Sequence, residues 1–244
     1  MDKNVPTGAA MILDLIYRTD AGKAPPACYE IIFGNRQNRL PKPITQMTLG
    51  DLIDAQKNWS SKQWVKKNWG ISGAASSASG AAQFMRDTLI GLAKELHLSG
   101  SQLFDANLQD RLGYHLLKRR GYEDFMAGKI SRTEFGKRLA MEWASFPVLT
   151  VCTGAHRQLQ RGQSYYAGDG LNKALVKPEK VEAVLNEVRA AKPIVVPPNH
   201  IPDAGNMVQK PVIPGAPEPV QKPVVTNPPA QPKGFWAWLF SFFR

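Results

Sequence analysis

The chain has 244 residues, 43% of them hydrophobic and 21% charged, which suits one globular domain with extensions. Its net charge is +11. Only four of the 31 basic and two of the 20 acidic residues fall in 193–244, so +9 belongs to residues 1–192. A basic domain attracts polyanions, whether nucleic acid, anionic lipid or a phosphate-rich cell envelope, and charge alone does not choose among them. Two cysteines, Cys28 and Cys152, are too few for a disulfide framework or a tetrahedral zinc site, and we expect two free buried thiols rather than one bridge.

The first predicted helix ends in an acidic residue. Thr7 has the side chain of an N-cap and Gly22 follows the last turn as a stop, while Asp20 extends the apolar face formed by Ala9, Ile12, Leu13 and Ile16. The Asp20 carboxyl is then either turned to solvent at the helix end or half-buried where a core meets a cleft. Half-burial raises the pKa of a carboxyl group and suits a general acid.

Residues 28–82 are predicted as a short strand, a loop and one helix. The β-prone run 28–33 ends at the turn signal Gly34-Asn35, and prolines interrupt residues 36–48. We expect Thr48 to cap a helix that continues to about Gln56. A loop of small residues covers 70–82. Before it lies a basic stretch that we expect to be partly exposed, containing Trp59, Lys62, Trp64, Lys66, Lys67 and Trp69.

Four more helices are predicted from apolar residues at helical spacing. They cover about 85–96, about 107–120, a segment that begins with a capping box of Ser131 and Glu134, and a segment that begins at Pro178. Glu142 lies on the apolar face of the third of these helices. It is either a catalytic group or a buried structural anchor, and the packing residues around it favour the anchor.

The C-terminal part has a different composition. Twelve of the 19 prolines lie between Pro193 and Pro232, so we predict an extended, largely disordered linker over 191–233. Residues 234–244 (GFWAWLFSFFR) would reach only about 16 Å as a helix, too short to cross a bilayer. We expect shallow contact with a membrane surface, or else packing on the domain or a partner, through Phe235, Trp236, Trp238, Phe240 and Phe242.

Several kinds of chemistry lack their motifs. The four histidines have no metal-site spacing, the glycine-serine loop lacks the ending of a phosphate-binding loop, and no serine or cysteine has a nucleophile-elbow context. No groove-reading helix pattern or RNA-binding aromatic motif is present, so we expect no specific nucleic-acid partner. Carboxylate chemistry remains, with Asp20, Glu30 and Glu142 as candidates.

An ordered set of segments resembles a known family. The acid that ends the first helix is followed by CYEIIFG (28–34), SSASGAAQFMRDTL (76–89), LQDRLGYHLLKRRGY (108–122), FMAGKIS (125–131), EWASFP (142–147) and SYYAGDGLNKA (164–174). This order is similar to that of the phage-lambda-type endolysins, which are lysozyme-like muramidases and lytic transglycosylases. The resemblance covers roughly residues 8–190. It implies an α+β fold, a mainly helical lysozyme-like domain over 1–190 with a short β-hairpin region.

The resemblance also implies roles for individual residues. Asp20 takes the place of the family's catalytic glutamate, and Tyr29-Glu30 matches a Tyr-acid pair that places Glu30 near the same cleft. Gln83 ends the segment that matches the family's Gly-x-x-Gln turn and would line the sugar site. Tyr29, Ser77 and Tyr165 also lie in matching segments, and we expect all three to contact substrate.

The residue at position 20 departs from the family pattern, because aspartate is one methylene shorter than glutamate. Misplacement of about 1 Å can cost about 100-fold in rate. Three alternatives follow: Asp20 works from a shifted helix end, Glu30 is the acid, or catalysis is lost and glycan binding is kept. No second carboxylate at close spacing is evident, which favours a transglycosylase, because there the 6-hydroxyl of the sugar replaces water.

The expected function is therefore that of a phage or prophage endolysin that cleaves the MurNAc-GlcNAc bond of peptidoglycan during host lysis. The alternative is a non-catalytic peptidoglycan-binding or virion structural protein on the same fold. We expect glycan strands as the partner, no cofactor, no metal and a monomer. No secretory signal is evident, so we expect synthesis in the host cytoplasm and action in the periplasm or cell wall after release through a holin-type hole or delivery in a virion.

Overall fold

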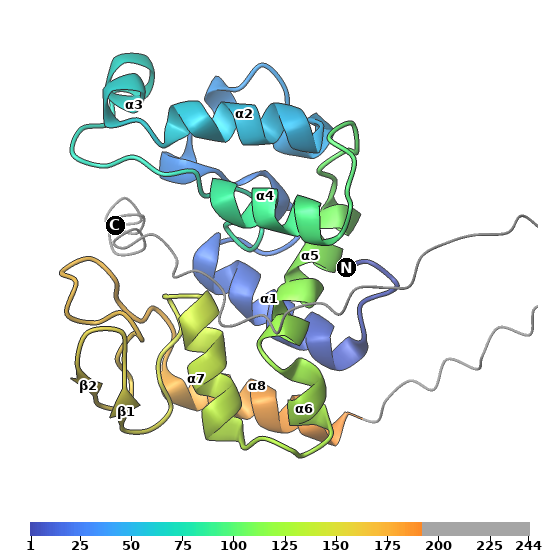
Figure 1. Cartoon of the computed structure of the whole chain (residues 1–244), viewed down its shortest axis with the longest axis vertical. Helices are drawn as coiled ribbons and strands as arrows, with labels where there is room; N and C mark the ends of the chain where they lie inside the picture. The colour runs from blue at the N-terminus through green and yellow to red at the C-terminus, as the bar shows by residue number, and fades with distance from the viewer. Residues whose placement is uncertain (192–244) are drawn as a thin grey trace, which may run out of the picture. The chain divides into compact units, whose positions relative to one another are not determined.

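Helices make up most of the computed structural model, which describes residues 1–191 (Figure 1). The α-helices of this part are α1 (Thr7–Asp20), α2 (Leu49–Trp59), α3 (Lys62–Trp69), α4 (Arg86–Glu95), α5 (Ala106–Arg119), α6 (Tyr122–Met126), α7 (Arg132–Glu142) and α8 (Pro178–Ala190). Short 3-10 helices are η1 (Ala27–Glu30), η2 (Phe33–Asn35), η3 (Gln37–Arg39) and η4 (Ile44–Gln46). The antiparallel strands β1 (Cys152–Thr153) and β2 (Gln158–Leu159) pair Cys152 with Leu159 and Thr153 with Gln158.

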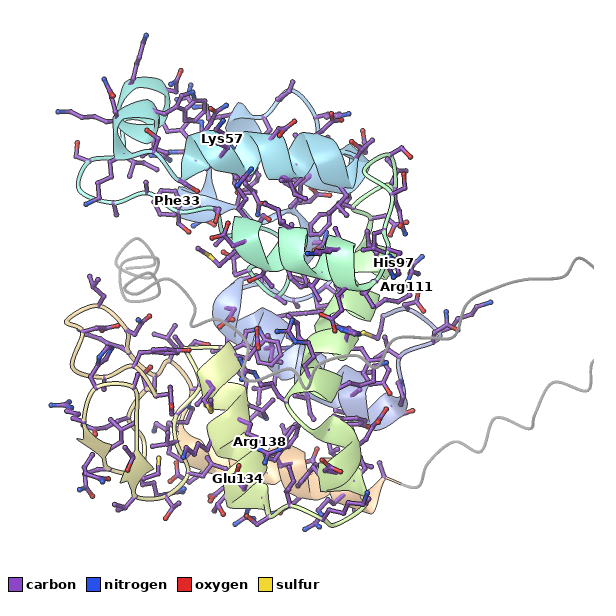
Figure 2. The ribbon with its side chains drawn as sticks, viewed as in Figure 1. Phe33, Lys57, His97, Arg111, Glu134 and Arg138 are labelled. Atoms are coloured by element: carbon purple, nitrogen blue, oxygen red, sulfur yellow. The ribbon has the colours of Figure 1, made fainter. Side chains whose placement is uncertain are left out.

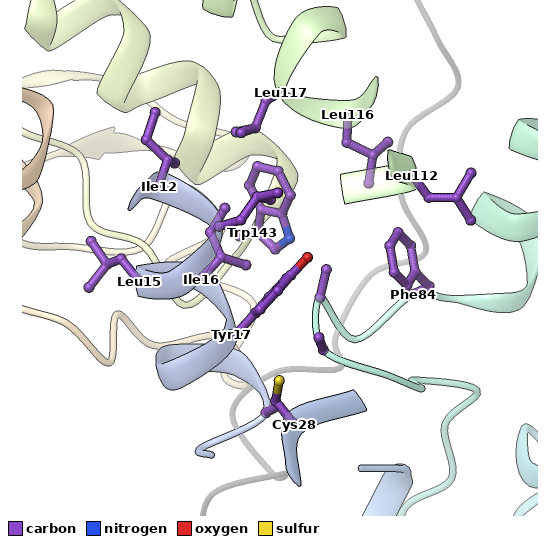
Figure 3. Close-up of a cluster of buried hydrophobic side chains, with 14 of the residues drawn as sticks. Ile12, Leu15, Ile16, Tyr17, Cys28, Phe84, Leu112, Leu116, Leu117 and Trp143 are labelled. Atoms are coloured by element: carbon purple, nitrogen blue, oxygen red, sulfur yellow. The ribbon is translucent and has the colours of Figure 1, made fainter. Parts of the chain in front are cut away.

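Helix α1 lies in the middle of the unit, between two groups of helices (Figure 1). It packs against α5 and α8, while α2 packs against α3 and α4, and α7 packs against α6 and α8. Figure 1 shows α2, α3 and α4 at the opposite end of the unit from α6, α7 and α8, with the small sheet beside α7. Within the core, Ile16 and Tyr17 of α1 face Trp143, and all three side chains are buried (Figure 3).

The predicted course of α1 is confirmed except at its start. The apolar stripe is buried from Ala9 to Ile16, and the helix ends at Asp20. Thr7 is the first helical residue, not the N-cap, and that position belongs to Pro6 without a side-chain hydrogen bond. Proline has a fixed φ that fits the entrance of a helix and no N–H to leave unsatisfied, so the chain enters α1 through Pro6.

The strand predicted over 28–33 is wrong. Residues Ala27–Glu30 form the 3-10 helix η1, and only Ile32 makes an isolated antiparallel bridge, with Ser79. The apolar run arises because it is buried on all sides, not because one face of a strand is covered. The turn signal after it is confirmed, since Gly34 and Asn35 both have positive φ values, of 65° and 53°.

The basic stretch with three tryptophans is a second correction. It contains the C-terminal end of α2 and all of α3, and Trp59 and Trp69 are only 2% and 7% exposed. Their ring centroids lie 5.7 Å apart, and Trp64 packs edge-on against Trp69 at 5.1 Å. Of the three, only Trp64 is partly exposed, because the two short helices close over a common tryptophan cluster.

The remaining helix signals are confirmed. Thr48 accepts a hydrogen bond from the Asp51 amide and caps α2, and Ser131 caps α7 in the same way through the Glu134 amide. Pro178 is the first residue of α8. Leu108, Leu112, Leu116, Phe135, Leu139, Trp143, Phe146, Val181, Val184, Leu185 and Val188 are all buried, as their helical spacing predicts.

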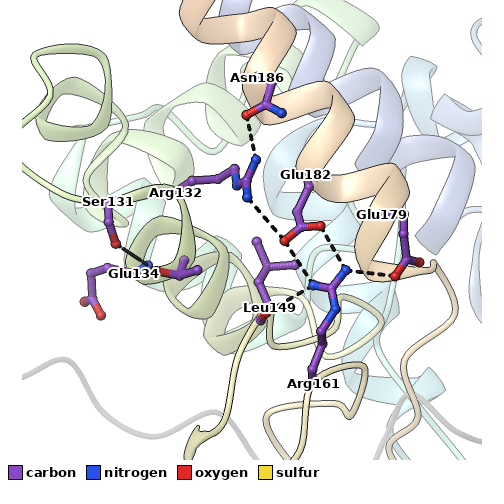
Figure 4. A network of polar contacts seen from close by, with 9 residues as sticks. Ser131, Arg132, Glu134, Leu149, Arg161, Glu179, Glu182 and Asn186 are labelled. Atoms are coloured by element: carbon purple, nitrogen blue, oxygen red, sulfur yellow. Dashed lines mark hydrogen bonds and ion pairs between the residues drawn. The ribbon is translucent and has the colours of Figure 1, made fainter.

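An ion-pair network fastens the loop after β2 to α8 (Figure 4). The Arg161 guanidinium lies 2.8 Å from Glu179 and 2.9 Å from Glu182, and it also donates to the backbone carbonyl of Leu149 at 3.1 Å. Arg132 of α7 pairs with the same Glu182 at 3.5 Å. The Glu182 carboxylate of α8 therefore binds arginines from both α7 and the loop after β2.

The coarse fold prediction is confirmed: the described part is mainly helical with one small antiparallel sheet. That hairpin lies at 152–159, far from the run at 28–33 where a strand was expected. The linker expected over 191–233 lies beyond Ala191 outside the described residues, as does the aromatic segment 234–244. No helix among residues 1–191 is both long and apolar enough to cross a bilayer.

Candidate active site

Asp20 lies at the C-terminal end of α1 and is fully buried, with 0% of its surface exposed. Its environment is therefore more closed than the half-buried position expected from the sequence. The hydroxyl of Ser145 donates a hydrogen bond to Asp20 Oδ1. Ser145 belongs to the segment between α7 and β1, and its backbone carbonyl accepts from the Leu175 amide at 2.7 Å. The acid thus lies where α1 meets two segments from the C-terminal half of the unit.

Burial dominates the electrostatics of this carboxyl group. It raises the pKa of Asp20 from 3.8 to about 8, and the hydrogen bond from Ser145 opposes the shift. No charged side chain contributes to this shift of the Asp20 pKa. Oδ2 is buried and has no hydrogen-bond partner among residues 1–191. A carboxyl group with this pKa is mostly protonated at neutral pH.

Glu30, the second candidate acid, has a different environment. It ends η1 and is partly exposed, and its carboxylate accepts hydrogen bonds from the hydroxyl and the backbone amide of Thr45. It is tied to η4 and not to α1. The described contacts therefore do not bring Glu30 and Asp20 together as a carboxylate pair.

Tyr29 points away from solvent. Its hydroxyl donates to Asp110 Oδ1 at 3.0 Å, and the Tyr17 hydroxyl of α1 donates to the same oxygen at 2.9 Å. The two rings meet edge-on with centroids 5.9 Å apart. Burial and the Asp110 charge both raise the pKa of the two phenols, so they remain donors at all physiological pH values.

Asp110 is a buried polar residue that the sequence reasoning did not select. It is in α5 and is only 1% exposed, and its other oxygen accepts from the Asp2 backbone amide at 2.7 Å. Through two tyrosines it ties α5 to α1 and η1. The signal that could have identified it is a Gln-Asp pair, Gln109-Asp110, set within a leucine stripe that is otherwise buried.

Gln83 and Ser77 lie in a turn that packs on residues 31–33. Gln83 adopts a positive φ of 48°, and its side-chain NH₂ donates to the carbonyls of Gly80 at 2.7 Å and Ile31 at 3.2 Å. Its Oε1 is buried without a partner in the described residues. Ser77 is buried, accepts from the Arg86 amide, and offers its carbonyl to Gln56 of α2.

The turn that contains Gln83 packs closely against the Gln109 side chain of α5. At Gly80 there is room for glycine only. Gly80 has a φ of +73°, and a Cβ there would lie 2.3 Å from Oε1 of Gln109. Gln109 donates in turn to the Tyr29 carbonyl at 3.1 Å and accepts from the Ala81 amide at 2.9 Å. The structure thus brings Tyr29, Ser77 and Gln83 into one region.

Tyr165 is in the loop after β2, in the same part of the unit as Ser145. It is partly exposed, and its ring meets Tyr166 edge-on at 5.3 Å. Next to it, the Ser164 hydroxyl donates to the Ala144 carbonyl at 2.7 Å. Within residues 1–191, neither Tyr165 nor Asp20 is joined directly to Gln83 by a hydrogen bond.

Glu142 is confirmed as a structural anchor. It is 8% exposed, and Arg120 at the end of α5 donates to it at 2.6 Å. Cys28 and Cys152 are both free, as expected, although Cys152 is only partly buried. A shallow pocket of about 220 Å³ opens beside Cys152 and is lined by Ser131, Thr133, Glu134, Lys137, Val148, Leu149 and Thr150, and it does not include Asp20. Residues 1–191 contain no cluster of acids, histidines and cysteines that could hold a metal ion.

Asp20 is therefore the strongest candidate for acid chemistry in this part of the chain, because it ends α1, is buried and has a raised pKa. Comparison of the chain with protein-family models, with curated proteins and with solved structures found no match.

Proposed function

We propose that this chain is a peptidoglycan-cleaving lysis enzyme that works as a lytic transglycosylase with Asp20 as its general acid. The observation that carries the proposal is the Asp20 carboxyl group, which is buried at the end of α1 and is held by Ser145. Its pKa of about 8 keeps a proton on it at neutral pH. A general acid works best when its pKa lies near the working pH, and this one does.

The chemistry needs one carboxyl group only. Asp20 would give its proton to the leaving glycosidic oxygen while positive charge develops at the anomeric carbon. The 6-hydroxyl of the same sugar then attacks that carbon and returns its proton to the Asp20 carboxylate. The product is a 1,6-anhydro sugar and no water is consumed. Glu30 is held by Thr45 and makes no described contact with Asp20, which supports this route over two-carboxylate hydrolysis.

The other residues named from the sequence would have supporting roles. Tyr165 has a partly exposed ring that it offers to a glycan, whereas the unpartnered oxygen of Gln83 is buried and becomes available only if the segments over it move. Tyr29 acts on Asp110 instead, and its proposed role is to hold η1 against α5. The aromatic segment 234–244 keeps its proposed role as a membrane-surface contact, although it lies outside the described residues.

A second function is favoured by one specific observation. Asp20 is fully buried and carries a shorter side chain than glutamate, so a sugar can reach it only after the covering segments move. A lysozyme-like protein whose acid stays closed would bind glycan strands without cleaving them. This non-catalytic binding protein, or virion structural protein, is the alternative.

The test is digestion of purified peptidoglycan with mass analysis of the released fragments. We expect the wild-type chain to release anhydro-muropeptides, each lacking one water relative to a hydrolysis product. Asp20→Asn should lower the rate by about 100-fold or more, because general acid catalysis contributes about that much. The matched control is Glu30→Gln, which should stay active.

Other outcomes decide among the alternatives. Loss of activity in Glu30→Gln with full activity in Asp20→Asn would move the acid to Glu30. Fragments with ordinary reducing ends would indicate a hydrolase. Sedimentation with cell walls without any released fragment, in wild type and variants alike, would establish the non-catalytic alternative.

A further inference from the structure

Four lysines form an exposed basic surface around α3 that the proposed chemistry does not use. We define this lysine surface as Lys57, Lys62, Lys66 and Lys67. All four are exposed, and none makes an ion pair with another described residue. Between Ala55 and Arg86 the chain has no acidic residue at all. No ion pair within residues 1–191 therefore neutralises these four charges.

The fold does not need these lysines. Helix α3 begins at the cap of Ser61, whose hydroxyl accepts from the Trp64 amide, and it ends at Gly70 in the left-handed region. It is held by Val65 and Trp69, which are buried against the tryptophan cluster that includes Trp59. In Figure 1 α3 projects beside the end of α2, where Figure 2 labels Lys57. The lysines thus occupy the side of a small helical hairpin that the core leaves uncovered.

The composition of this surface indicates the chemistry of its partner. Lysine carries a compact, strongly hydrated point charge and lacks the bidentate geometry with which arginine reads one particular phosphate or base. Such a surface suits a dense field of phosphates more than a single built site. Trp64 is partly exposed among the lysines, and tryptophan is enriched at membrane–water interfaces. The exposed face of α3 has no apolar stripe, so the contact would be adsorption and not deep insertion.

We propose that the lysine surface docks on the phosphate headgroups of an anionic lipid bilayer. Clusters of four or more basic residues bind such surfaces, and each lysine raises the membrane partition coefficient roughly fivefold. Salt weakens this attraction. This inference does not depend on the proposed function, because docking is measured on vesicles without cell wall.

The experiment is sedimentation of the full chain with vesicles of phosphatidylglycerol and phosphatidylcholine, and with phosphatidylcholine alone. The test variant is Lys57→Gln, Lys62→Gln, Lys66→Gln and Lys67→Gln together. The matched control is Lys3→Gln, Lys94→Gln, Lys173→Gln and Lys180→Gln, four other exposed lysines whose removal changes the net charge by the same amount. We expect the test variant to bind anionic vesicles at least about 50-fold more weakly than wild type, and the control less than about fivefold.

Four results would overturn the proposal. Equal losses in the two variants would mean that overall charge and not this surface drives binding. Failure of the wild-type chain to bind anionic vesicles in low salt would remove the partner. Retained vesicle binding in the test variant, with binding to duplex DNA lost, would assign the surface to nucleic acid. Unchanged thermal unfolding of both variants shows that the losses are not due to misfolding. A Trp236→Ala and Trp238→Ala variant separates the contribution of the aromatic segment, and loss of vesicle binding there alone would also contradict the proposal.

Discussion

The Ser145 hydroxyl donates a hydrogen bond to Oδ1 of Asp20, a residue 125 positions earlier in the chain. The contact joins the end of α1 to the segment that follows α7. It supplies one donor to a carboxyl group whose other oxygen has none within the described residues. The state of the proton on Asp20 therefore depends on a contact between two distant parts of the chain.

Replacing Ser145 should move the Asp20 titration upward. The hydroxyl stabilises the charged carboxylate, so Ser145→Ala should raise the pKa of Asp20 above its value of about 8. Carbon-13 NMR of the aspartate carboxyl groups across a pH series measures the shift. Ser164→Ala is the matched control, since it removes a buried hydroxyl that bonds the Ala144 carbonyl instead. An unchanged Asp20 titration in Ser145→Ala would mean that the hydrogen bond is absent in solution.

The buried acid should also make stability depend on pH. The pKa of Asp20 is about 8 in the folded chain, against 3.8 for an aspartate in an unstructured peptide, so between these values the folded state holds a proton that the unfolded state has lost. The free energy of unfolding contributed by Asp20 therefore falls as pH rises from about 4 to 8, by at most about 1.4 kcal/mol per pH unit, and is level above 8. Asp20→Asn removes this slope.

Urea unfolding at pH 5 and at pH 7.5 measures the difference. We expect the stability of Asp20→Asn relative to wild type to increase between the two values. Glu30→Gln serves as the control, and its stability relative to wild type should change much less. A constant difference between Asp20→Asn and wild type would contradict the burial of an acid with a raised pKa.

The Asp110 cluster should contribute to stability through its hydroxyl donors. Tyr17→Phe removes one donor to a buried carboxylate while keeping the ring in the core. We expect a loss of about 1–3 kcal/mol in the free energy of unfolding, the usual cost of leaving a buried charged group short of a partner. Urea unfolding at pH 7 tests it. Tyr114→Phe, whose hydroxyl has no hydrogen bond to a described residue, should cost much less, and equal losses would argue against the cluster.

Two helical glycines should respond to alanine with opposite signs. A Cβ at Gly91 in α4 would meet nothing within 4 Å, so Gly91→Ala should stabilise the protein by about 0.5–1 kcal/mol through its helix propensity. A Cβ at Gly136 in α7 would lie 2.4 Å from Leu149 Cδ1, and the Leu149 carbonyl is itself bound by Arg161. Gly136→Ala should therefore destabilise it by about 1–3 kcal/mol.

Thermal unfolding of the two variants beside wild type gives the signs directly. Stabilisation by both substitutions would mean that α7 does not pack on Leu149 as described. Loss of stability in both would mean that α4 is crowded where the structure leaves it open.

The sequence determined most of the helices, because each is recorded in the local spacing of its apolar residues and in its caps. Thr48, Ser131 and Pro178 begin their helices as expected, and the stripe of α1 is buried. These features depend on neighbours within one or two turns, which a linear pattern contains.

Only the tertiary structure decided the rest, because those features depend on residues far apart in the chain. The apolar run at 28–33 is compatible with a strand or with a fully buried turn, and in the folded chain Ala27–Glu30 form the 3-10 helix η1. Tyr29 was expected to face a sugar, yet its hydroxyl bonds Asp110, 81 positions later. For Asp20, the pattern located an acid on an apolar face. The tertiary structure decided that this acid is fully buried, which raises its pKa, and that Ser145 hydrogen-bonds to it, which opposes the rise.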